Sequence, residues 1–254
     1  PLEVKLIFGV SIGIALLPLV TWLFAIFSIP LTQTTVIIFL VLFAIASIRI
    51  FRFSGFRIEK RVQGLEILLI GILFLSLFSS LLPIHNLQVP PFADPALQGM
   101  ITRLMIIHQG IPDTWSPFLP IAFQHQPGFA SIVAWFSLFS SVPIPQIILF
   151  LTNIVHARFP FSLNLLAYSL SKNRAGSVVT AALGLIAIFP TSLFVAGANA
   201  SVLMYPLSIV AAGVAILFLR EGVAHVQKAA EQLSLPRKYS GFSTYRNAFL
   251  FFSV

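Results

Sequence analysis

The sequence predicts an all-α protein: a polytopic transmembrane helix bundle with an external loop that contains an amphipathic interfacial helix. Two observations lead to this fold class. Hydrophobic residues make up 58% of the 254 residues and charged residues only 9%, whereas a soluble domain carries about 25% charged residues. The apolar residues also form runs of about 20, the length that crosses a bilayer as a helix. Soluble enzymes and disordered tails are therefore excluded.

Six apolar runs are the expected membrane spans, at about residues 4–29, 35–50, 65–83, 146–170, 175–196 and 201–219. A further run, 128–142, is short for a span and is expected to be interfacial or re-entrant. Arg158 and Pro160 interrupt the fourth expected span. We expect one transmembrane domain over 1–254, in a protein that continues beyond Val254, because the chain stops inside an apolar run.

Lysine and arginine gather in alternate connections between these spans, as they do in cytoplasmic loops of membrane proteins. The basic connections contain Arg49, Arg52, Arg57, Lys60 and Arg61, then Lys172 and Arg174, then Arg220, Lys228, Arg237, Lys238 and Arg246. The turns at 30–34 and 197–200 have no basic residue, and the segment 84–145 has only Arg103. We therefore expect a multi-pass protein of the cytoplasmic membrane, with its N-terminus and residues 220–246 cytoplasmic and 84–145 external. These loops account for the net charge of +8, so nucleic acid is not an expected partner.

The external segment contains two of the seven acidic residues, Asp94 and Asp113. Asp94 precedes a run, Pro95 to His108, whose apolar residues recur every three or four positions, which predicts an amphipathic helix along the membrane surface. Gln98, Thr102 and Arg103 are expected off its apolar face. Asp94 has two compatible interpretations, a helix N-cap and a carboxylate that accepts a proton from an attacking hydroxyl.

The other polar candidates each have a structural and a functional interpretation. Asp113 lies in a turn-forming sequence, Gly110 to Trp115. His108 and His125 fit polar loop residues or, with Asp94, ligands of a divalent metal, although the close ligand spacing typical of metal sites is missing. Arg158, within an expected span, needs a partner, a path to water or an anion such as a lipid phosphate, because an isolated charge there is unfavourable. No cofactor is predicted with certainty.

The external segment resembles a pattern found in polyprenyl-phosphate-dependent membrane glycosyltransferases of the C-type fold, which include protein mannosyltransferases and aminoarabinose transferases. The resemblance covers about 80 residues, from Asp94 to roughly Leu170. The matching strings are Ala93-Asp94-Pro95, Ile101-Thr102-Arg103-Leu104, His108-Gln109-Gly110-Ile111-Pro112, Trp115-Ser116-Pro117-Phe118 and His125-Gln126-Pro127-Gly128-Phe129. The sequence departs from the family pattern at Ala130, where a histidine is frequent, and no second acid neighbours Asp94.

The resemblance implies transfer of a sugar from a lipid-linked, polyprenyl-phosphate donor to an acceptor on the external face. Asp94 then matches the catalytic base, and Arg103, His108, His125 and Arg158 are the expected substrate contacts, with either arginine balancing the lipid phosphate. A multi-spanning transporter or permease, a non-catalytic membrane assembly subunit and an oligosaccharide polymerase or ligase remain alternatives. Broken helices and Arg158 within the membrane would suit a transporter.

Overall fold

Helices dominate the computed structural model, which describes residues 2–53, 64–90, 93–195, 208–220 and 222–224. Within these residues there is no strand, and the single β-bridge joins Thr114 to Ala122. The all-α prediction is therefore confirmed. The chain forms two compact units, Pro1–Val214 and Ala215–Val254, and the helices up to residue 195 belong to the first. The expected cytoplasmic segment 220–246 lies almost wholly outside the described residues.

The first two expected spans are helices, α1 (Leu2–Ile26) and α2 (Gln33–Phe53). Thr32 and Thr35 start α2 through a reciprocal pair of hydrogen bonds. The Thr35 amide donates to Thr32 Oγ1 at 3.3 Å, and the Thr32 amide donates to Thr35 Oγ1 at 2.9 Å. This pair satisfies amide groups that have no partner inside the first turn of a helix, so the turn that precedes α2 is well defined.

The third expected span is α3 (Gly64–Leu81), which continues into the 3₁₀ turn η1 (Leu82–Ile84). Together they form Gly64–Ile84, the one helix among the described residues that is long and apolar enough to cross a membrane by itself. Its 21 residues rise about 30 Å, which matches the thickness of a bilayer core.

The fourth expected span is two helices, α6 (Ile144–His156) and α7 (Phe159–Ser171). The interruption expected at Arg158 and Pro160 is present, because proline has no N–H to donate to the carbonyl four residues earlier. The preceding helix, α5 (Gly128–Ser140), and the segment Ile144–Ser171 are bent by 116°. This bent pair is long and apolar enough to be a broken span or a re-entrant loop, and the second of these is one of the two expectations for 128–142.

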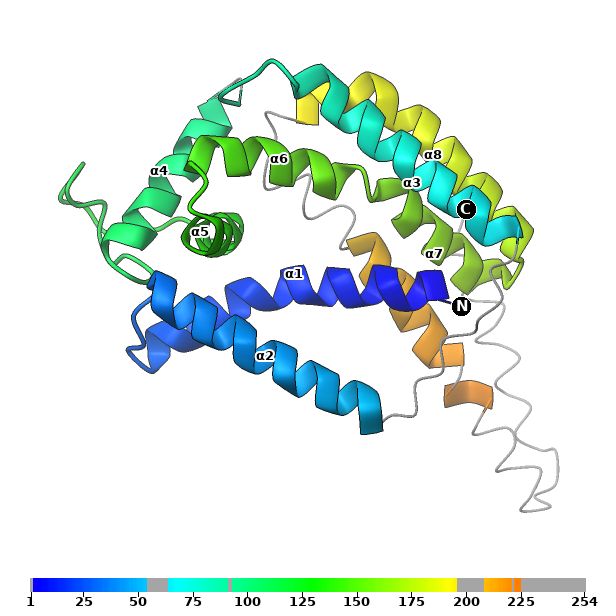
Figure 1. Cartoon of the computed structure of the whole chain (residues 1–254), viewed down its shortest axis with the longest axis horizontal. Helices are drawn as coiled ribbons and strands as arrows, with labels where there is room; N and C mark the ends of the chain where they lie inside the picture. The colour runs from blue at the N-terminus through cyan, green and yellow to red at the C-terminus, as the bar shows by residue number, and fades with distance from the viewer. Residues whose placement is uncertain (1, 54–63, 91–92, 196–207, 221, 225–254) are drawn as a thin grey trace. The chain divides into compact units, whose positions relative to one another are not determined.

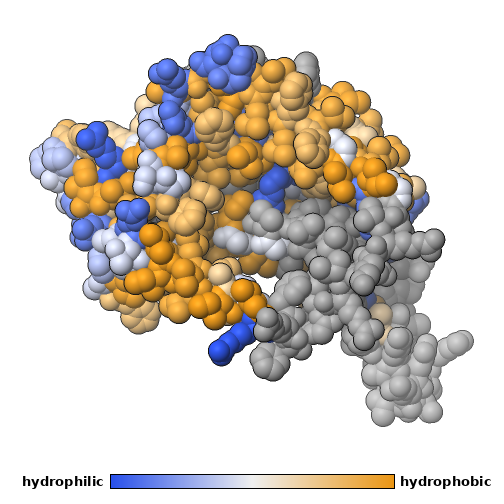
Figure 2. Space-filling model, viewed as in Figure 1, coloured by the Kyte–Doolittle hydropathy of each residue, from blue (hydrophilic) through white to orange (hydrophobic). Residues whose placement is uncertain are grey.

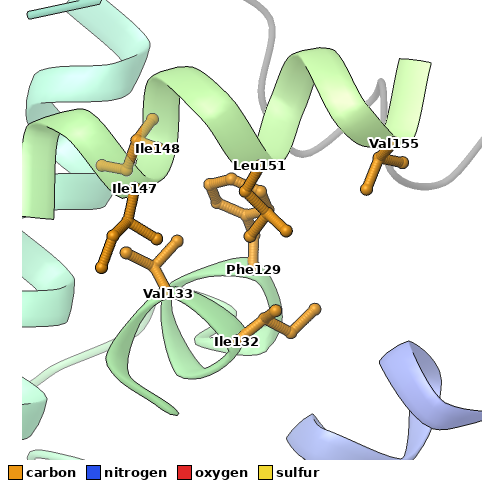
Figure 3. Packing of buried hydrophobic residues seen from close by; sticks show 7 residues of the cluster. All are labelled: Phe129, Ile132, Val133, Ile147, Ile148, Leu151 and Val155. Atoms are coloured by element: carbon orange, nitrogen blue, oxygen red, sulfur yellow. The ribbon is translucent and has the colours of Figure 1, made fainter. Parts of the chain in front are cut away.

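Two groups of helices pack within the first unit (Figure 1). In one, α3 and α7 lie against α8 (Arg174–Val195), which corresponds to the fifth expected span. In the other, α4 (Ala93–Ile107), α5 and α6 contact one another, and α1 and α2 also pack on α5. Figure 3 shows the core between α5 and α6, formed by Phe129, Ile132, Val133, Ile147, Ile148, Leu151 and Val155. Of the sixth expected span, residues 208–219 are described and helical.

In the second half of α3, the distribution of side chains is the reverse of that on a water-soluble helix. Its buried residues include Ser76 and Ser80, both fully buried, whereas Phe74 and Phe78 are 73% and 63% exposed. Exposed apolar side chains also cover much of α1, α2 and α8, and orange dominates the described surface in the view of Figure 2. Soluble proteins rarely expose apolar surface so continuously, so the exposed face of α3 is suited to lipid.

Candidate functional site

Helix α4 carries the predicted base, Asp94, in its first turn. The expected helix, Pro95 to His108, is present with slightly different bounds, Ala93–Ile107. Asp94 is therefore a residue of the helix itself and not the N-cap that the sequence suggested. Its carboxylate is exposed at the N-terminal end, where the unpaired amide groups and the helix dipole stabilise a negative charge.

The apolar face of α4 packs against the protein interior. Ile101, Leu104 and Met105 are buried in a cluster with Trp115 and Ala130. Thr102, which was expected off the apolar face, is also fully buried. Its hydroxyl lies 2.8 Å from the Gln98 carbonyl and 3.3 Å from the Ala130 carbonyl, either of which it donates to. A threonine can be buried here because a backbone carbonyl satisfies its hydroxyl.

Helix α4 connects the end of η1 to the turn between α1 and α2 (Figure 1). It begins nine residues after Ile84, and Gln109, just beyond its end, accepts a hydrogen bond from the Leu31 amide at 2.5 Å. Both connections belong to segments expected outside the membrane. The exposed carboxylate of Asp94 therefore lies on a helix that runs between one end of α3–η1 and the turn that joins α1 to α2.

The five predicted site residues do not converge on one point. Arg103 follows Asp94 by nine residues, which on a helix is a rise of about 13 Å and a rotation of about 180°. His108 follows Asp94 by fourteen residues, a rise of about 21 Å. Both side chains are exposed. Asp94 is thus separated from Arg103 by the body of α4 and from His108 by its length.

The two predicted histidines each contact a short hairpin that follows α4. His108 Nε2 lies 2.9 Å from the Ser116 carbonyl oxygen. The His125 ring contacts the Trp115 ring edge to face, with centroids 5.5 Å apart. The Trp115 amide donates to the Ile121 carbonyl at 2.9 Å, which closes the hairpin. His108 and His125 therefore flank one loop, at the end of α4 opposite Asp94.

Asp113 belongs to the same hairpin. Its carbonyl accepts a hydrogen bond from the Phe123 amide at 2.9 Å, and its side chain is exposed. This placement agrees with the interpretation of Asp113 as a turn residue. Among the residues that the structure describes, no group of three or more His, Cys, Asp or Glu side chains is arranged to hold a metal ion.

Arg158 is half-buried at the junction between α6 and α7. Its carbonyl accepts a hydrogen bond from the Phe161 amide at 3.0 Å, so Arg158 is the N-cap residue directly before α7. Helix α4 contacts α6 near Ile148, where Gly99 would place a Cβ 3.6 Å from the Ile148 side chain. Arg158 is ten residues further along, a rise of about 15 Å. Arg158 therefore lies well away from the place where α4 contacts α6.

A second set of polar groups lies buried between α3 and α6. Ser76 Oγ donates to the Ala157 carbonyl at 2.6 Å, next to the helix break. Ser80 and Asn153 are fully buried nearby on the same two helices. The serines were not among the predicted site residues, although Ser76, Ser79 and Ser80 interrupt an otherwise apolar span at helical spacing.

Comparisons with protein families, with curated proteins and with solved structures find no match to this chain.

Proposed function

We propose that this protein is a multi-pass membrane protein with its N-terminus on the cytoplasmic side. The reversed character of α3 supports this, because lipid accommodates the exposed phenylalanines while the interior satisfies the serines. Two contacts agree with the expected topology. Leu31 and Gln109, both in segments expected outside, share a hydrogen bond, and Glu66 and Arg174, next to basic connections expected inside, are 3.9 Å apart.

On this framework, the protein transfers a sugar from a polyprenyl-phosphate donor to an acceptor hydroxyl on the external face. The observation that carries the proposal is the exposed Asp94 carboxylate in the first turn of α4, the helix that runs from the end of η1 toward the α1–α2 turn. A base at this position is open to the interface from which a lipid-linked donor arrives. The resemblance of the surrounding strings to C-type glycosyltransferases supplies the reaction class.

The reaction is a single displacement. Asp94 takes the proton from the acceptor hydroxyl as its oxygen bonds to the anomeric carbon. The bond from that carbon to the phosphate oxygen breaks, and the lipid phosphate leaves with the electron pair. Arg103, exposed on the same helix, offers one positive charge for the phosphate. Because Arg103 points away from Asp94, a donor that meets both side chains has to lie across α4.

The test is sugar transfer by the full-length protein in lipid nanodiscs, with a panel of radiolabelled hexosyl and pentosyl polyprenyl phosphates. Asp94→Asn removes the base and is expected to slow transfer by roughly 10²–10⁴-fold. Asp113→Asn is the matched control, because Asp113 is an exposed acid of the same segment and transfer should be unchanged. Full transfer by a stably inserted Asp94→Asn variant would refute the base, and no consumption of any donor would refute the reaction.

A transporter is the second candidate, because α6 and α7 break at Ala157 and Arg158 with buried polar groups beside the break. Transporters bind substrates at such interrupted helices. This alternative predicts that Asp94→Asn is without effect on function and that substitutions at the break abolish it. Loss of sugar transfer on Asp94→Asn, with unchanged protein stability, would exclude it.

A further inference from the structure

Helices α3 and α6 pack antiparallel, and two contacts define their register. Ser76 Oγ donates to the Ala157 carbonyl at 2.6 Å. Ile84 and Leu149 share a buried cluster. Ile84 follows Ser76 by eight residues, and Leu149 precedes Ala157 by eight residues, so the two segments run in opposite directions in step. Four residues is about one helical turn, so Ser80 and Asn153 face each other midway between the two contacts.

Both of these side chains carry a polar atom without a partner. Ser80 and Asn153 are each 0% exposed, and neither Ser80 Oγ nor Asn153 Oδ1 makes a hydrogen bond within the structure. The Asn153 carboxamide is nevertheless oriented, because its Nδ2 donates to the Leu149 carbonyl at 2.8 Å. Its oxygen is therefore the atom left for another group, since exchanging oxygen and nitrogen would lose that bond.

The two unpartnered atoms are chemically complementary. A serine hydroxyl donates one hydrogen bond and accepts others, whereas an amide oxygen only accepts. Buried polar atoms without partners are rare and unfavourable, and internal water molecules commonly satisfy them. A water between these atoms accepts a hydrogen bond from Ser80 and donates one to Asn153. Because the two oxygens do not bond directly, a bridging molecule meets the requirement of both.

We propose that the contact between α3 and α6 contains an internal water site, formed by Ser80 Oγ and Asn153 Oδ1. The site lies one turn from the break between α6 and α7, where Ser76 already holds the Ala157 carbonyl. With this water, two consecutive turns of α3 make polar contacts with the last turns of α6. The proposal concerns packing at the break and is independent of sugar transfer.

The direct test is a high-resolution structure of the full-length protein in nanodiscs. The expected result is density for one water within about 3 Å of both Ser80 Oγ and Asn153 Oδ1. An empty space between the two atoms would overturn the proposal, and so would a direct hydrogen bond between them.

A double-mutant cycle on thermal unfolding provides a second test. Ser80→Ala and Asn153→Ala are each expected to lower the unfolding temperature, and the double variant should lower it by less than the sum, because one water serves both side chains. Ser79→Ala is the matched control, because Ser79 Oγ bonds within its own helix to the Ser76 carbonyl. Combined with Asn153→Ala, it should give an additive effect. A higher unfolding temperature for Ser80→Ala would overturn the proposal, since removing a truly unsatisfied hydroxyl stabilises a protein.

Discussion

Arg174 Nη2 lies 3.9 Å from Glu66 Oε1, so the first turns of α3 and α8 are at the same end of the helix pair. The contact continues along both helices in parallel. The buried residues that follow the ion pair in this interface are Leu69 and Ile72 on α3 and Val178 and Ala181 on α8. Two parallel helices of a membrane protein enter the bilayer from the same side, which agrees with the basic connections that precede both of them.

Reversing the two charges tests this pairing. Glu66→Arg or Arg174→Glu alone places like charges together and is expected to lower stability by less than about 1 kcal/mol, because both side chains are partly exposed. The double variant, Glu66→Arg with Arg174→Glu, should recover part of that loss. The measurement is the thermal unfolding midpoint in detergent at low salt. Equal and additive effects of the two single substitutions would show that the pair makes no coupled contribution.

The expected topology predicts opposite labelling of two engineered cysteines. These 254 residues contain no cysteine, so a single introduced thiol is the only target within them. Ser116→Cys, in the exposed hairpin after α4, should react with a membrane-impermeant maleimide in intact cells. Lys172→Cys, in the exposed turn between α7 and α8, should react only after the membrane is opened. Labelling of both positions from one side would contradict the topology.

Gly184 on α8 packs closely against α7, so replacing it with alanine is expected to destabilise the protein. A Cβ at Gly184 would lie 2.9 Å from Leu163 Cδ1 and 3.2 Å from Pro160 Cα. The leucine can move, but the proline backbone cannot move without shifting α7. Gly184→Ala should therefore cost about 1–3 kcal/mol. Gly71→Ala is the control, because nothing lies within 4 Å of its Cβ. Equal unfolding midpoints for the two variants would contradict this packing.

The helices themselves could be predicted from the sequence because their signals are local. Apolar runs mark α1, α2, α3 and α8, and Pro160 marks the break between α6 and α7. The apolar spacing after Asp94 predicts α4 to within about two residues, the usual uncertainty at helix ends. The position of the helix start decides the role of Asp94. A start at Pro95 makes it the N-cap, whereas the observed start at Ala93 places it inside the first turn.

The arrangement of the site could not be predicted, because it depends on contacts between distant segments. Sequence proximity grouped Asp94 with His108, but a straight helix holds them about 21 Å apart. Thr102 looks like a surface residue until the Ala130 carbonyl is seen beside it. Likewise, the role of Ser76 depends on Ala157, which is 81 residues away in the chain. No periodicity within one helix contains that information.

A buried hydrogen bond between α1 and α5 gives the strongest single test of how the first helix packs. Trp135 Nε1 donates to Thr21 Oγ1 at 2.8 Å, and the two residues are 2% and 1% exposed. Thr21→Val keeps the shape but leaves the indole N–H without a partner, which should cost about 1–3 kcal/mol.

Three further variants separate this bond from packing. Thr21→Ser keeps the hydroxyl and should retain most of the stability, whereas Trp135→Phe removes the donor. Adding Thr21→Val to Trp135→Phe should then cost little, because the unsatisfied N–H is already gone. The unfolding midpoint in nanodiscs measures all four variants. If Thr21→Val is as costly in the Trp135→Phe background as in the natural protein, the loss comes from the contact of Thr21 with the Leu17 carbonyl, at 2.9 Å, and the α1–α5 bond contributes nothing.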